Sequence, residues 1–90
     1  MLIALICTDK PGALETRKAN RDAHLAYIKE TGVVAQAGPF LDSDGAMCGS
    51  LVILDVADLD AAHRWAEHDP YAKAGLFQDV RIEQWNKVIG

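Results

Sequence analysis

Two segments of this chain are apolar on both faces, and no other feature of the sequence constrains the fold as strongly. Residues 2–8 begin Leu-Ile-Ala-Leu-Ile-Cys, and residues 48–56 contain Leu-Val-Ile-Leu. Both segments are too short for typical helices and are flanked by turn-forming residues, so we predict that both are β-strands. A strand with one face in water alternates apolar and polar residues, whereas these two do not. Both faces of their sheet must therefore be covered.

The other elements are predicted from their start and stop signals. They are a helix over 13–31, a strand over 33–37, a helix over 59–68, a short helical turn over 70–75 and a strand over 77–86. Gly32 suits the left-handed end of the first helix, and Asp58 suits the N-cap of the second. Gly38-Pro39 interrupts the second strand. Because proline cannot donate to a ladder, we expect this strand to lie at a sheet edge or to bend at Gly38-Pro39.

The resulting order, β-α-β-β-α-β, is typical of an α+β, ferredoxin-like fold. In that fold a four-stranded antiparallel sheet carries both helices on one face. A chain of 90 residues has no further element to cover the opposite face. We therefore expect a single domain over residues 1–90 whose open face packs against a second copy, sheet to sheet, in a two-fold homodimer. Dimerisation would also stabilise so small a domain.

Composition excludes several classes of function. The net charge of −4 and the pI near 5.1 argue against binding to nucleic acid or to an anionic membrane surface. No apolar run reaches the roughly 18–20 residues that span a bilayer. Two cysteines cannot build a disulfide scaffold, so a cytoplasmic protein with free thiols is the simplest interpretation. No redox-cofactor or metal-binding motif is present, and we expect no cofactor and no metal.

The first predicted helix carries a group of cationic side chains. Arg17, Arg21 and His24 share one stripe of it, because they lie four and three residues apart. Two guanidinium groups beside an imidazole suit recognition of an anion. The alternative is an ordinary solvated face paired with nearby acidic residues, Glu15 and Asp22. This stripe borders the apolar stripe of the same helix, which contains Leu14, Leu25 and Ile28.

Asp69, at the end of the second helix, is the candidate partner for this imidazole. A carboxylate that accepts from one ring nitrogen of a histidine fixes its tautomer and stabilises the imidazolium. The fold permits a His24–Asp69 pair, because both helices lie side by side on one sheet face. The alternative is that Asp69 only caps the turn before Pro70. Ser50 lacks the context of a catalytic nucleophile and is expected at most to offer a hydroxyl to a pocket.

Four short motifs stand along the chain, at residues 16–25, 37–39, 49–50 and 66–75, and together they resemble motifs of the YciI-like family. The segment 16–25 resembles that family's R-x3-R-x2-HL helix, and 66–75 resembles its D-P-Y-x2-A-G segment. Ala37-Gly38-Pro39 resembles its AGP strand end, and Gly49-Ser50 its GS strand start. The resemblance runs in register from residue 1 to about 89. It implies a dimeric α+β barrel of ferredoxin-like fold, with one YciI-like domain over residues 1–90.

The same resemblance implies a His–Asp pair in a cleft as the catalytic centre. By matching position these residues are His24 and Asp69. Four further residues match the family motifs and are expected to bind substrate: Arg17, Arg21, Ser50 and Tyr71. The fold is shared with cofactor-free monooxygenases, lactone isomerases and dehydrohalogenase-like lyases, so the fold alone does not select a reaction.

Three hypotheses follow from the sequence. The first is a small cofactor-independent enzyme in which His24 and Asp69 transfer a proton, in an elimination or isomerisation, on a small aromatic or anionic molecule. A lyase or an isomerase would fit this description. The second is a non-catalytic small-molecule-binding or accessory dimer that uses the same pocket. The third is a purely structural hydrogen bond between the two helices.

Overall fold

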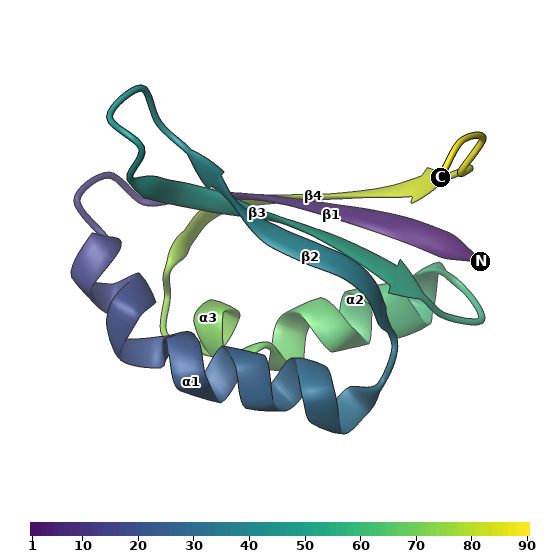
Figure 1. The fold of residues 1–90 in the computed structure, drawn as a ribbon. Helices are drawn as coiled ribbons and strands as arrows, with labels where there is room; N and C mark the ends of the chain where they lie inside the picture. The colour runs from purple at the N-terminus through teal and green to yellow at the C-terminus, as the bar shows by residue number, and fades with distance from the viewer.

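The computed structural model describes residues 1–90 as one antiparallel sheet with three helices on one of its faces (Figure 1). The elements are β1 (Leu2–Asp9), α1 (Leu14–Thr31), β2 (Val34–Leu41), β3 (Met47–Asp55), α2 (Leu59–His68), α3 (Pro70–Lys73) and β4 (Phe77–Trp85). The strand order is β2-β3-β1-β4, and all three pairings are antiparallel. This arrangement confirms the predicted ferredoxin-like α+β fold. None of the helices is both long and apolar enough to cross a bilayer.

The strand β2 differs from the sequence-based prediction at its end. It continues through Gly38-Pro39 to Leu41 and is not interrupted there. Pro39 lies opposite Ser50 of β3. Because β2 pairs only with β3, its other edge needs no N–H donor, and a proline fits without breaking a ladder bond. The predicted edge position of this strand is therefore confirmed, and the predicted interruption is wrong.

The helix ends follow the local signals in the sequence. Gly32 has φ = 65°, and its N–H donates to the carbonyl oxygen of Ile28 at 3.3 Å. A glycine reaches this left-handed conformation without the steric cost that a Cβ imposes. Asp58 caps α2, because its carboxylate accepts from the N–H of Ala61 at 2.8 Å. The end of α1 and the start of α2 are therefore determined by residues that the sequence already marks.

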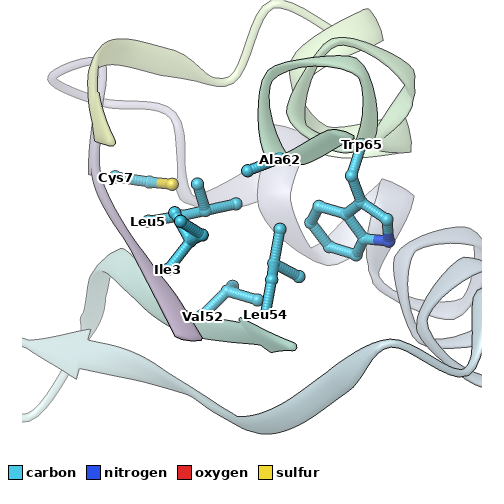
Figure 2. Close-up of a cluster of buried hydrophobic side chains, with 7 residues drawn as sticks. All are labelled: Ile3, Leu5, Cys7, Val52, Leu54, Ala62 and Trp65. Atoms are coloured by element: carbon cyan, nitrogen blue, oxygen red, sulfur yellow. The ribbon is translucent and has the colours of Figure 1, made fainter. Parts of the chain in front are cut away.

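The hydrophobic core lies between the sheet and the helices (Figure 2). Alternate residues of the two central strands point toward α2 and meet its buried side chains. The cluster contains Ile3, Leu5 and Cys7 of β1, Val52 and Leu54 of β3, and Ala62 and Trp65 of α2. Two side-chain hydrogen bonds attach α1 to this core. Tyr27 donates to the carbonyl oxygen of Trp65 at 2.8 Å, and the indole N–H of Trp65 donates to Thr31 at 2.9 Å.

Helix α1 buries its predicted apolar stripe only in part, because Leu14 and Ile28 are half-buried and Ile28 packs against the core. Its two buried residues are Arg17 and His24, whereas Leu25 is 44% exposed. Both polar side chains have partners on other elements, Asp9 and Asp69 respectively. Hydrogen bonds to charged partners offset the cost of burying polar groups, and this allows the polar stripe to face the sheet.

The opposite face of the sheet carries no element of this chain (Figure 1). The remaining residues of the central strands lie on it, with Ala4 opposite Ile53 and Ile6 opposite Leu51. Leu51 is 37% exposed there, and Trp85 of β4 is 39% exposed. The structure thus confirms strands that are apolar on both faces. A second copy as the cover of this face stays a prediction.

Candidate active site

A short hydrogen bond joins the middle of α1 to the residue between α2 and α3. Nδ1 of His24 lies 2.7 Å from Oδ1 of Asp69, and the two residues are 6% and 3% exposed. The same oxygen of Asp69 accepts from the backbone N–H of Tyr71 at 3.0 Å, which caps α3. Since an ionised carboxylate only accepts, Nδ1 carries the proton in this pair. The other ring nitrogen, Nε2, then has a free lone pair when the imidazole is neutral.

Tyr71 forms a flat wall beside this imidazole. The rings of His24 and Tyr71 stack with centroids 3.9 Å apart and planes 16° apart. The guanidinium carbon of Arg17 lies 4.8 Å from the Tyr71 centroid, a distance typical of a cation–π contact. Burial raises the pKa of the Tyr71 phenol above its ordinary value, and the nearby Arg17 and Arg21 oppose this rise only in part. The phenol therefore stays protonated at neutral pH and can donate a hydrogen bond.

The guanidinium group of Arg17 donates hydrogen bonds to two residues, Asp9 and Ser50. Its Nε and Nη2 donate to the two carboxylate oxygens of Asp9, at 2.7 and 2.9 Å, and Nη2 also donates to Oγ of Ser50 at 2.8 Å. Burial lowers the pKa of Arg17, but the hydrogen bonds and charge of Asp9 outweigh burial and hold that pKa above its ordinary value. This bidentate geometry is the strong form of an Arg–carboxylate pair. The guanidinium is thus charged and already paired.

Sequence reasoning missed Asp9. It lies at the end of β1, directly before Lys10-Pro11-Gly12, where the sequence suggested only a turn. An acidic residue at the end of a central strand was the one signal available, and it is weak. The pairing register supplies the missing information, because Cys7 lies opposite Ser50 and the end of β1 is therefore adjacent to the site.

Position 49, directly before Ser50, requires a glycine. A Cβ built at this position would collide with the carbonyl oxygen of Cys7 on the neighbouring strand. Only glycine permits this close approach of β3 to β1. The next residue, Ser50, is 3% exposed and accepts a hydrogen bond from Arg17. The Gly-Ser pair therefore acts through backbone geometry as well as through the hydroxyl.

These side chains surround a cavity of about 190 Å³ between α1 and the β2–β3 side of the sheet. Five of the six residues singled out from the sequence line it: Arg17, Arg21, His24, Ser50 and Tyr71. Asp69, the sixth, contacts His24 from outside the lining. Gly38-Pro39 of the AGP segment also lines the cavity, opposite α1. The structure thus brings all six residues together, and their chemical roles stay predictions.

Comparison with known proteins places the chain in a family. The family model described as the YCII-related domain matches residues 1–86. The protein YciI of Escherichia coli is 36% identical over 98 residues, an alignment that covers 99% of this chain and all of that protein.

Two solved structures are similar in fold. The 5-chloro-2-hydroxyhydroquinone dehydrochlorinase of Burkholderia phenoliruptrix, solved with 2,5-dihydroxybenzoquinone, superposes with a TM-score of 0.89 at 36% identity and covers 96% of this chain and 94% of its own. An antibiotic biosynthesis monooxygenase superposes at 0.62 with 14% identity, over 99% of this chain and all of its own, and shares the fold alone. The family model and the full-length identity to YciI together show that this chain belongs to the YciI-like family.

Proposed function

We propose that this protein is a small cofactor-independent enzyme in which His24 and Asp69 carry out proton transfer on a small molecule. The observation that carries this proposal is the 2.7 Å bond between Nδ1 of His24 and Asp69, made by an imidazole that also lines a cavity. A base whose one nitrogen is held by a carboxylate and whose other nitrogen is free is arranged for general acid–base catalysis.

The proposed step begins with Nε2 of His24 accepting a proton from the bound molecule. Asp69 stabilises the resulting imidazolium and keeps the ring in place. The proton then returns at another atom in an isomerisation, or leaves with the departing group in an elimination. Positioned general base catalysis contributes roughly 10²–10⁴-fold in rate. The solved relative from Burkholderia phenoliruptrix is named a dehydrochlorinase, and this supports the lyase-like alternative.

The remaining lining residues are proposed to bind and orient the substrate. Tyr71 stacks on His24 and supports its ring, and its protonated phenol can donate a hydrogen bond. Ser50 and Arg17 form a hydrogen-bonded wall, and Arg21 stands at the exposed rim. The relative's solved complex contains 2,5-dihydroxybenzoquinone, and this supports a small planar ring as the class of molecule that the cavity takes.

The proposed working unit is a homodimer that packs through the open sheet face. Supporting this, the face exposes apolar side chains and contains a groove of about 890 Å³ beside Leu2, Ile53 and Trp85. Exposed apolar patches of this kind are typical of interfaces. A cytoplasmic location is proposed with it, because both cysteines are free thiols. No histidine lines this groove, so we do not assign the chemistry to it.

A kinetic experiment tests the proposed reaction. Small halogenated and hydroxylated ring compounds would be screened for loss of halide or for isomerisation, and His24→Ala would be compared with wild type on any compound that turns over. His63→Ala is the matched control, because His63 is exposed on α2 and does not line this cavity.

We expect loss of turnover in His24→Ala only, with an unchanged circular dichroism spectrum. Full turnover in the folded His24→Ala variant would overturn the proposal. Ligands that raise the melting temperature without forming any product would instead favour a binding module.

A further inference from the structure

The two arginines that line the cavity beside His24 differ in whether an acidic side chain compensates their charge. The cavity lining contains two arginines and one histidine, and it contains no carboxylate. Of the two arginines, Arg17 is neutralised by a bidentate bond to Asp9. Arg21 takes part in none of the ion pairs or side-chain hydrogen bonds of the structure, whose four ion pairs involve other residues. Arg21 is therefore the one full positive charge of the lining that no acidic side chain compensates.

The helix around Arg21 explains why it has no partner. Its neighbours three and four residues away are Arg17, Lys18, His24 and Leu25, none of which is acidic. Asp22 is adjacent in sequence, and adjacent residues do not face one another on a helix. The sequence left open that Arg21 pairs with Asp22 on a solvated face. The structure contains no such ion pair.

The size and walls of the cavity limit what Arg21 can bind. The volume of about 190 Å³ is slightly larger than the roughly 150 Å³ of an engineered cavity that takes benzene. One wall is the nearly parallel stack of His24 on Tyr71. A single six-membered ring with few substituents fits these dimensions, whereas a nucleotide does not.

We propose that Arg21 alone provides charge recognition at this site, and that the ligand is a single planar ring bearing one oxyanion, either a carboxylate or a ring-bound oxygen. The oxyanion meets Arg21 at the exposed rim, and the ring lies deeper, beside His24. Arg17 contributes a wall without net charge, because Asp9 cancels its charge locally. This inference rests on the proposed function only in treating the bound ring as a substrate.

A pair of isosteric probes tests the inference without any turnover. Benzoate and benzamide have the same ring and nearly the same size, but only benzoate is charged. Their dissociation constants would be measured by titration calorimetry or NMR shifts, at low and high salt, on wild type, Arg21→Gln and Lys18→Gln. Lys18 is the matched control, because it is an exposed cation on the same helix that does not line the cavity.

We expect benzoate to bind wild type about tenfold more tightly than benzamide at low salt, since a charge-assisted bond at an exposed rim is partly screened. Arg21→Gln should reduce this ratio to about one, and Lys18→Gln should leave it unchanged. Equal binding of the two probes by wild type, or a ratio that survives in Arg21→Gln, would overturn the inference.

The affinity ratio and the turnover, measured together, distinguish failure of the proposed reaction from failure of this inference. The ratio of the two affinities would also be measured in His24→Ala, where any loss of ring stacking affects both probes alike. A ratio retained in an enzyme that shows no turnover supports charge recognition by Arg21 and counts against catalysis. A ratio of one together with turnover that depends on His24 supports catalysis and counts against Arg21.

Discussion

Oδ1 of Asp69 accepts from Nδ1 of His24 at 2.7 Å and from the backbone N–H of Tyr71 at 3.0 Å, so one carboxylate oxygen caps α3 and holds the imidazole. Forty-five positions separate the two paired residues in the chain. Asp69 therefore makes both contacts that the sequence suggested for it, a helix cap and a hydrogen bond to a histidine, and its chemical role stays a prediction. The two roles can be separated by mutation, because an amide can still cap a helix but carries no charge.

Asp69→Asn should lower kcat roughly 10²–10⁴-fold with little change in KM, because the amide no longer stabilises the imidazolium and its NH₂ group favours the wrong tautomer of His24. Asparagine and aspartate are equally good N-caps, so α3 should remain intact. Asp58→Asn is the matched control, since it makes the same change at the cap of α2, where no histidine is bound. Steady-state kinetics on both variants provide the comparison, and a similar kcat for the two would contradict this prediction.

Asp9→Asn should destabilise the protein by about 3–5 kcal/mol, because it leaves the Arg17 guanidinium buried without its charged partner. Urea unfolding followed by fluorescence of the two tryptophans would measure the free energy of unfolding. Asp79→Asn is the control, because Asp79 is exposed on β4 and makes no ion pair. A loss below about 1 kcal/mol in Asp9→Asn would mean that solvent or another group replaces the carboxylate.

Leu51→Glu should convert the proposed dimer to a monomer, because it places a charge in the middle of the apolar open face beside Ile6. Sedimentation velocity at several concentrations would report the mass. Leu59→Glu is the control, since Leu59 on α2 has a similar exposure, 42% against 37% for Leu51, and lies on the helical side. A monomeric wild type, or a Leu51→Glu variant that still dimerises, would show that this face is not the interface.

Stability should fall as the pH rises above about 9. Burial, helped by the negative charge of nearby Asp69, raises the pKa of the Cys7 thiol from 9.0 to about 12. Between these values the unfolded chain has released the proton and the folded chain keeps it, so the free energy of unfolding decreases with pH. Burial raises the pKa of Tyr27 and Tyr71 in the same direction and adds to this decrease above pH 10.

Cys7→Ala should therefore show a weaker decrease between pH 8 and pH 11 than Cys48→Ala, whose thiol is only half-buried. The comparison uses the slope of the free energy of unfolding with pH, not its absolute value, because removing a core side chain also leaves a small cavity. Equal slopes for the two variants would show that Cys7 does not titrate in this way.

The sequence by itself determined the type and order of the elements and the edge position of β2, but not the length of β2. These features depend on interactions between residues close in the chain, such as the capping of α2 by Asp58, the left-handed Gly32 and the missing N–H of Pro39. Apolar patterning on β1 and β3 likewise predicts that both sheet faces are covered; the helices cover one face, and a cover for the other stays a prediction. The resemblance to the YciI-like family then pointed to the six residues that the structure places around or against one cavity.

Only the tertiary structure decided how charge is distributed among those residues. Nothing in the local sequence distinguishes Arg17 from Arg21, which share a helical stripe. The fold buries Arg17 against Asp9 and leaves Arg21 at the rim without an acidic partner. It also buries His24 in place of the apolar Leu25. The physical reason is that a buried charge needs a partner of opposite sign, and which partner it meets depends on strand register and helix docking between segments distant in the chain.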